Sequence, residues 1–328
     1  MPPELMKGPL IAACCALAAA PAAPGWAQTE NFPARPVRLI VPFAPGGSVD
    51  LISRMVGAKL AETLGQQVVV DNRAGASGNI GSELVARAAP DGYTLLVNTT
   101  PFVVNTHLMG KVPYDVLNDF VPVSLLSSSP SLLTVHPSLP VRSVRELLAL
   151  AKSRPGALNY SSAGIGTNPH IAGELFNHLG KVNIVAIHYK GGGPGLVAAA
   201  SGEVVATFTN IAETTAYVRA GRLRAIGVSS LTRSKIVPEV PTVAESGMPG
   251  YEFVAWFAML APKGTSRPVA ALLNERVRKA LAAPDLVRRF EETGLQIIAS
   301  TPEELTAHLR RELDKWGPVI RERGMRAE

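Results

Sequence analysis

Residues 37–65 read VRLIVPFAPGGSVDLISRMVGAKLAETLG, and this stretch decides the fold. Its first part is rich in apolar and β-branched residues, which favours a strand. A turn follows at Pro45-Gly-Gly-Ser48, and apolar residues then recur at helical spacing up to Gly65. The order strand, glycine turn, helix predicts the first half of a βαβ unit.

The same rhythm continues on the C-terminal side and then restarts. Strands are expected at 67–70, 93–97, 131–136, 158–161, 184–189, 204–208 and 223–228. Helices are expected at 79–89, after Ser143 as N-cap through Lys152, and after Asn168 as N-cap with Pro169 at N1. The pattern therefore predicts two α/β units.

The C-terminal part is mainly helical in pattern, with helices expected at 268–281, 285–293 and 303–321. The last of these begins with Thr301-Pro-Glu-Glu304, a capping-box sequence. We assign residues 28–130 together with 253–328 to lobe one and residues 131–252 to lobe two. The two chain crossovers between the lobes are expected to act as a hinge.

Residues 1–27 are expected to be a cleaved signal peptide. An apolar stretch from Leu10 to Ala20 precedes the small residues Gly25 and Ala27, so cleavage is predicted after Ala27. Cys14 faintly matches a lipoprotein box, but lipidation there would leave too short an apolar segment. Because both cysteines lie in this segment, the mature protein is expected to lack disulfides, cysteine nucleophiles and thiolate metal sites.

Composition narrows the function classes. The 328 residues are 47% hydrophobic and 18% charged, which is typical of a globular protein. The net charge of +6 comes from scattered Lys and Arg without basic runs interleaved with aromatics, so nucleic-acid binding is not expected. No continuous apolar span after residue 27 is long enough for a bilayer, so we expect a soluble mature protein without stable membrane insertion.

Four glycine-containing turns follow predicted strands and precede predicted helices, at 43–50, 74–80, 161–170 and 189–196. In open α/β sheets, ligands lie in the crevice at these strand ends. Glycine lets the backbone approach a ligand, and the first N–H groups of each helix attract an anion. Any one turn can be explained as simple chain reversal, but four of them, two in each lobe, predict a cleft that binds an anion.

Motifs for chemistry are missing from these turns. Ser77 lies in Gly75-Ala-Ser-Gly-Asn79, which misses the nucleophile elbow at its last residue. His170 and Glu174 have a spacing that could share a metal, but no cluster supplies further ligands. No glycine loop matches a nucleotide motif. We therefore expect no catalytic residue, no metal and no cofactor.

At these turns the sequence resembles the Bug family, the periplasmic receptors of tripartite tricarboxylate transporters. The resemblance includes Val37-Arg-Leu-Ile-Val-Pro-Phe-Ala-Pro-Gly-Gly-Ser-Val-Asp50 and Val68-Val-Val-Asp-Asn-Arg-Ala-Gly-Ala-Ser-Gly-Asn-Ile-Gly81. Further matching stretches lie at 32–36, 90–96, 113–115, 119–123, 189–191, 241–245 and 260–265. The resemblance implies an α/β, two-lobed type II periplasmic-binding-protein (Venus flytrap) fold, each lobe a mainly parallel sheet flanked by helices.

The resemblance also implies a function: capture of a small organic carboxylate between the lobes, without chemistry, by a monomeric periplasmic receptor. The implied partners are the membrane subunits of a transporter. Two alternative functions remain open: the periplasmic partner of a two-component sensor, and an enzyme on the same bilobal fold. The predicted ligand-binding residues are Phe43, Ala44, Gly46, Gly47, Ser48, Asp50, Ser77, Gly78, Asn79, Thr99, Ser162, Ala163, Gly164, Thr167, His170, Tyr189, Thr209 and Asn210.

Two positions depart from the family pattern. Val49 stands where the family usually has Thr, and Thr209-Asn210 stands where it usually has Asp-Asn. Glu213 is expected to lie a helical turn beyond the cleft. With no carboxylate then available to pair an ammonium, the hypothesis is a ligand without an amine, either a small dicarboxylate or an aromatic acid. The alternative is that Thr209 faces the core and carries no information about the ligand.

Overall fold

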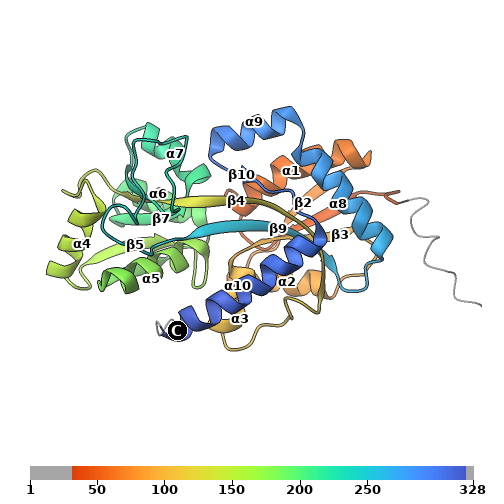
Figure 1. Ribbon diagram of the computed structural model, residues 1–328, viewed down its shortest axis with the longest axis horizontal. Coiled ribbons are helices and arrows are strands. Elements are labelled where there is room, and N and C mark those ends of the chain that lie inside the picture. The colour runs from red at the N-terminus through yellow and green to blue at the C-terminus, as the bar shows by residue number, and fades with distance from the viewer. Residues whose placement is uncertain (1–31, 323–328) are drawn as a thin grey trace, which may run out of the picture.

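The computed structural model describes residues 32–322. The predicted signal peptide lies outside the described residues. Two lobes lie side by side along the long axis of the molecule, and the long strands β4 (Phe120–Val135) and β9 (Val254–Pro262) run between them (Figure 1). The two-lobed α/β fold expected from the sequence is therefore the fold of the structure.

The first lobe contains residues 37–65, which form a strand, a glycine turn and a helix. β1 (Val37–Val41) leads through the glycine turn into α1 (Ser48–Leu64), which ends at Gly65 with φ 68°. β2 and β3 flank β1 and run parallel to it. The other elements of this part are β2 (Val68–Asn72), the 3₁₀ turn η2 (Ala76–Gly78), α2 (Asn79–Ala86), β3 (Thr94–Thr99) and α3 (Pro101–Leu108).

The second lobe repeats the pattern with β5, β6 and β7. β5 pairs parallel with both β6 and β7. Ser143 caps α4, as predicted, by accepting a hydrogen bond from the Glu146 N–H. The elements are α4 (Val144–Ser153), β5 (Leu158–Ser162), α5 (Asn168–Gly180), β6 (Ile184–His188), α6 (Gly192–Ser201), β7 (Ala206–Asn210), α7 (Ile211–Arg219) and β8 (Arg224–Val228).

The strands join in the order β2-β1-β3-β9-β4-β7-β5-β6, with β8 and β10 also paired to β4. β4 and β9 run antiparallel to their neighbours, so the sheet is mixed and parallel only towards the outer strands of each lobe. The physical reason is that parallel neighbours need a βα crossover, whereas β4 and β9 enter each lobe directly from the other. β4 runs continuously through residues 130 and 131, where the sequence placed a lobe boundary. The lobe boundaries themselves stay predictions.

The C-terminal helices pack against the first lobe. α8 (Arg267–Leu281) contacts α1, and α10 (Pro302–Glu322) contacts α3 and β4. Between them lie α9 (Pro284–Thr293) and β10 (Gln296–Ile297). The capping box of α10 forms as predicted: the Glu304 N–H donates to Thr301 Oγ1, and the Thr301 N–H donates to Glu304 Oε2.

One local prediction was wrong, and one helix was missed. Thr167, not Asn168, is the N-cap of α5, because Thr167 keeps an extended backbone (φ −80°, ψ 164°) while Asn168 is already helical. The helix α3 was not predicted, since its eight residues are too few to show a clear period.

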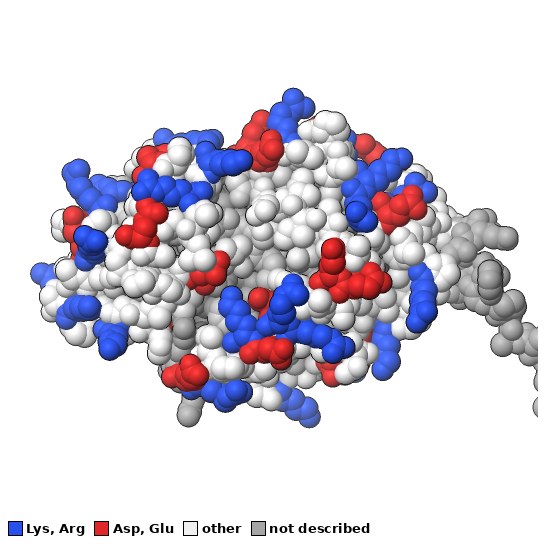
Figure 2. Space-filling model, viewed as in Figure 1, with Lys and Arg blue, Asp and Glu red and all other residues white. Residues whose placement is uncertain are grey.

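On the surface, charges of both signs are interspersed over the face shown in Figure 2.

Candidate functional site

A cavity of about 50 Å³ lies between the two lobes. Its walls come from the turns that precede several helices in both lobes. The lining residues are Phe43, Ala44, Gly47, Ser48, Val49, Thr99, Pro101, Ala163, Thr167, Asn168, Pro169, Gly191, Gly192, Asn210 and Glu213.

The helices α1, α3, α5, α6 and α7 all begin at this cavity, because a residue from the first turn or the N-cap of each is in its lining. The first N–H groups of a helix have no partner within the helix, and they carry the positive end of its dipole. Their convergence makes the cavity suited to an anion without any Lys or Arg in its lining.

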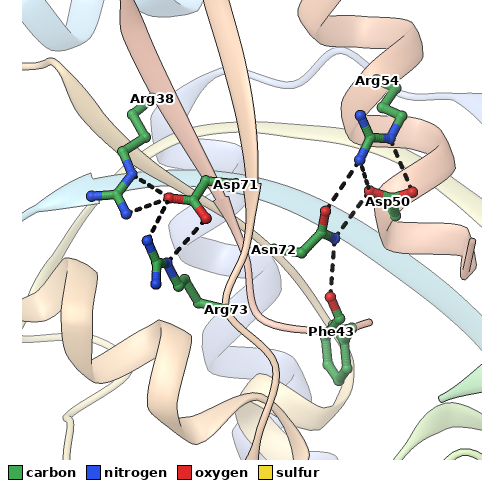
Figure 3. A network of polar contacts seen from close by, with 7 residues as sticks. All are labelled: Arg38, Phe43, Asp50, Arg54, Asp71, Asn72 and Arg73. Carbon is green, nitrogen blue, oxygen red and sulfur yellow. Dashed lines mark hydrogen bonds and ion pairs between the residues drawn. The ribbon is translucent and has the colours of Figure 1, made fainter. Parts of the chain in front are cut away.

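The wall from the first lobe is the turn at residues 43–48, and Asp50 holds it in shape. Asp50 Oδ2 accepts a hydrogen bond from the Gly46 N–H at 3.0 Å, and Oδ1 accepts one from Asn72 Nδ2 at 3.0 Å. Asn72 Nδ2 also donates to the Phe43 carbonyl, so the turn is tied at both ends (Figure 3). Gly46 has φ 86°, a conformation that glycine adopts without strain.

Asp50 is buried yet well paired. Burial raises its pKa, but hydrogen bonds from Arg54, the Gly46 N–H and Asn72 outweigh that effect and leave the pKa below its ordinary value. Arg54 also forms an ion pair with Asp50 at 2.9 Å. Asp50 is therefore ionised and stabilises the turn, and both of its carboxylate oxygens already accept hydrogen bonds.

Hydrogen bonds connect the two walls of the cleft. The Ser48 N–H donates to Glu213 Oε1 at 2.7 Å, and Asn168 Nδ2 donates to Thr99 Oγ1 at 3.2 Å. The Ser77 hydroxyl donates to the Ile165 carbonyl. The lobes are thus in contact at the cleft, and a cavity of about 50 Å³ has room for only a few water molecules.

Glu213 is the charged residue of the cavity lining, and its predicted place beyond the cleft was wrong. It lies in the first turn of α7, three residues after the N-cap Asn210. Part of the residue is accessible to solvent, but its Oε2 atom is buried without a hydrogen-bond partner. Burial raises the pKa of Glu213 to about 7, against a smaller opposing effect of the hydrogen bond from Ser48.

The structure brings part of the predicted site together at the cavity. The predicted residues that line it are Phe43, Ala44, Gly47, Ser48, Thr99, Ala163, Thr167 and Asn210. The predicted residues outside the lining are Gly46, Asp50, Ser77, Gly78, Asn79, Ser162, Gly164, His170, Tyr189 and Thr209. Their roles as ligand contacts stay predictions.

Several of these outer residues have identifiable partners. The Tyr189 hydroxyl donates to Glu203 Oε1 at 2.8 Å, and Thr209 Oγ1 is hydrogen-bonded to Thr207 Oγ1 at 2.6 Å. His170 Nδ1 accepts from the Gly166 N–H, so it shapes the glycine turn before α5. Burial and, secondarily, the nearby His188 lower the pKa of His170 to about 4, which keeps it neutral.

Sequence reasoning missed seven lining residues: Val49, Pro101, Asn168, Pro169, Gly191, Gly192 and Glu213. Most of them are neighbours of predicted residues in the same turns. Glu213 could have been found from its spacing, because Asn210-x-x-Glu213 resembles a capping box and therefore marks the start of a helix directly after a strand.

Within residues 32–322, no group of three or more His, Cys, Asp or Glu side chains is arranged to hold a metal ion. None of the helices described there is both long and apolar enough to cross a membrane.

The chain is similar to proteins of one family. The model of a family described as "Tripartite tricarboxylate transporter family receptor" matches residues 52–325. Protein BugT of Bordetella pertussis is 40% identical over 299 residues, which cover 90% of this chain and 92% of BugT.

Solved structures agree with this similarity. The periplasmic binding protein BugD has a TM-score of 0.87 at 32% identity, covering 90% of this chain and 100% of BugD. R. palustris Rpa4515 with adipate has a TM-score of 0.86 at 36% identity, covering 89% and 98%. MatC (Rpa3494) from Rhodopseudomonas palustris with bound malate has a TM-score of 0.85 at 34% identity, covering 88% and 100%.

Proposed function

This chain belongs to the tripartite tricarboxylate transporter receptor family, and we propose that it is a periplasmic solute-binding protein that captures a small organic carboxylate between its lobes. The observation that carries the proposal is the convergence of the N-termini of α1, α3, α5, α6 and α7 on one cavity. Backbone N–H groups at such ends hold a carboxylate by hydrogen bonds and by the helix dipoles. The similar structures that contain adipate and malate support the same ligand class.

Capture requires the lobes to move. A cavity of about 50 Å³ is too small for a dicarboxylate, and ligand sites usually have several hundred Å³. The lobes are connected by β4 and β9, so we propose that bending near these strands opens the cleft. The ligand then binds to the open cleft, and closure forms the second set of contacts around it.

The proposal includes no chemical step. The carboxylate of Asp50 is engaged in supporting the turn, and Ser77 donates its hydroxyl hydrogen to a carbonyl across the cleft. These contacts favour a binding role over an enzyme on the same fold. A periplasmic ligand sensor would use an identical site, so the membrane partner is proposed from the family: the membrane subunits of a tripartite transporter.

The protein is also proposed to be exported to the periplasm. Residues 1–27 are proposed to direct the chain to the periplasm, where the mature monomer begins at Gln28. The intact mass of the periplasmic protein tests this directly. A mass that starts at Gln28 supports it, whereas a diacylglycerol adduct on Cys14 would contradict it.

The ligand class is tested by thermal unfolding with matched acids and amides. Malate, succinate, adipate and benzoate are compared with their uncharged amides at equal concentration. At 100 times Kd a ligand stabilises by about 2.7 kcal/mol, which raises Tm by roughly 5 °C for a chain of this size. Saturable stabilisation by at least one acid and by none of the amides is expected. No stabilisation by any carboxylate would contradict the proposed function.

A further inference from the structure

Three residues of the cavity lining have buried polar atoms without hydrogen-bond partners. These atoms are Asn168 Oδ1, Asn210 Nδ2 and Glu213 Oε2, and all three belong to the second lobe. Native proteins pair nearly all of their buried polar groups. Unpaired atoms that gather in a proposed ligand cleft therefore indicate which groups the ligand brings.

The contacts of the two amides fix which of their atoms is free. Thr99 Oγ1 donates its hydrogen to the Trp256 carbonyl at 2.6 Å, so it accepts from Asn168 Nδ2 and leaves the oxygen of Asn168 free. Asn210 Oδ1 accepts from the Ala212 N–H at 3.0 Å and from Ser129 Oγ at 3.1 Å, which leaves the nitrogen free. The cavity thus has a free neutral acceptor and a free donor.

Glu213 adds a second free acceptor, which is charged when ionised. Its side chain does not turn back to cap its own helix but reaches across the cleft to the Ser48 N–H. Oε2 lies against Gly192, where an added Cβ would stand only 2.8 Å from it, so the site keeps space for this oxygen by using glycine. Within residues 32–322, no Lys or Arg forms an ion pair with Glu213.

We propose that Glu213 and Asn168 determine specificity by binding an ammonium group, so that the captured carboxylate is an amino acid. This inference rests on the proposed function and names its ligand class. An ammonium has three donors and no acceptor, which matches the free oxygens of Glu213 and Asn168. The carboxylate of the same ligand accepts from Asn210 Nδ2 and from the helix N-termini.

A ligand hydroxyl would pair the free oxygens of Glu213 and Asn168 less completely than a ligand ammonium. It donates only one hydrogen, and it leaves the charge of Glu213 without a counter-charge in a buried place. Burial raises the pKa of Glu213 to about 7, so its surroundings disfavour this charge. A neighbouring ammonium removes that penalty.

The hypothesis of a ligand without an amine rested on two premises that the structure does not support. Thr209 does not line the cavity, and its hydroxyl is bonded to Thr207. Glu213 supplies the carboxylate that was thought to be missing. The same physical rule, that a buried charge must be paired, now favours the amino ligand.

The experiment compares matched triplets that differ in one substituent. They are aspartate, malate and succinate; glutamate, 2-hydroxyglutarate and glutarate; 2-aminoadipate, 2-hydroxyadipate and adipate; and phenylglycine, mandelate and phenylacetate. Kd is measured by calorimetry for the mature protein, for Glu213→Gln, and for Glu239→Gln as a matched control at an exposed glutamate of the same lobe. Thermal melting confirms that each variant is folded, and Glu213→Ala is the second variant.

In the native protein and in Glu239→Gln, the amino member of at least one triplet is expected to bind about tenfold to a hundredfold more tightly than its analogues. Glu213→Gln and Glu213→Ala are expected to lose that preference. Tighter binding of a hydroxy or unsubstituted acid would overturn the inference but keep the proposed function. An amino preference that survives both Glu213 variants would also overturn it. If no member of any triplet binds, the proposed function fails and the inference fails with it.

Discussion

Asp50 and Glu213 bind the same turn from opposite lobes, and their surroundings differ. Asp50 accepts from the Gly46 N–H, pairs with Arg54 and Asn72, and has a lowered pKa. Glu213 accepts from the Ser48 N–H, has one unpaired oxygen, and has a pKa raised to about 7. The carboxylate that supports the first-lobe wall of the cavity is therefore paired, whereas the wall from the second lobe has unpaired polar atoms at Asn168, Asn210 and Glu213.

The difference suggests a division of roles between the lobes. A turn that is held in shape before binding loses little entropy when a carboxylate arrives. Unpaired groups on the other wall gain most when a ligand of the right chemistry fills the site. On this account the preformed turn of the first lobe helps to bind the carboxylate common to the whole class, and Glu213 and Asn168 of the second lobe select among its members.

The largest effect is expected for Gly47→Val, which tests the role of the first lobe. Gly47 lines the cavity with an ordinary φ of −86°, and an added Cβ would meet nothing closer than the Ala44 carbonyl at 3.9 Å. The variant should therefore fold, but its side chain would fill the space beside the α1 N-terminus. We expect the Tm of the empty protein to stay within a few degrees and ligand-induced stabilisation to vanish. Unchanged binding would move the carboxylate site elsewhere.

The next prediction is that removing the Asp50 carboxylate and removing the Glu213 charge change the free energy of unfolding in opposite directions. Asp50→Ala removes a paired carboxylate and should lower the free energy of unfolding by about 1–3 kcal/mol, because the Gly46 N–H and Asn72 lose their acceptor. Glu213→Gln removes a buried charge and should therefore raise the free energy of unfolding at pH 8. Urea unfolding measures both. Destabilisation by Glu213→Gln at pH 8 would show that Glu213 is as well paired as Asp50.

The pH dependence sharpens the comparison further. The pKa of Glu213 is raised from 4.5 to about 7, so the folded protein keeps a proton there that the unfolded chain has already released. The free energy of unfolding therefore falls as pH rises through this window. The advantage of Glu213→Gln over the native protein should be absent below pH 4.5 and reach about 1–3 kcal/mol above pH 7. For Asp50 the pKa is lowered, so its stabilisation is present above pH 3.8 and is lost as pH falls.

An equal advantage of Glu213→Gln at pH 4 and pH 8 would contradict this account. Chemical denaturation of the two proteins at several pH values gives the comparison. Because both proteins share every other titrating group, the difference between them isolates Glu213.

Much of the fold could be predicted from the sequence because local signals were strong. The segment around Val37–Gly65 has a clear change from strand to helix, and the N-cap at Ser143 and the capping box at Thr301 formed as expected. The antiparallel placement of β4 and β9 could not be predicted, because strand direction depends on partners far away in the chain.

The site was predicted less completely for a related reason. Glycine turns indicate where a chain approaches a ligand, and the turns at 43–48 and 189–196 do contribute to the cavity. Glu213 was misplaced because its side chain reaches across the cleft to the Ser48 N–H, a contact between residues far apart in the chain that no local pattern shows. Whether a side chain such as Tyr189 turns inward or outward depends on its partner, here Glu203, and no sequence pattern showed that pair.

The smallest effect is expected for a neutral contact across the cleft. Ser77→Ala removes the hydrogen bond to the Ile165 carbonyl but no charge. It should lower the free energy of unfolding by about 1 kcal/mol and leave the pH dependence of stability unchanged. A pH-dependent effect as large as that of Glu213→Gln would show that the contrast between the carboxylates has another origin.

The central claim is that the cleft holds a small carboxylate and returns it unchanged. Native mass spectrometry of the protein purified from the periplasm, followed by identification of the released molecule, tests it most directly. The account predicts one small carboxylic acid per chain, identical in mass before and after long incubation with the protein. A bound molecule without a carboxylate, or one that the protein converts into another compound, would contradict it.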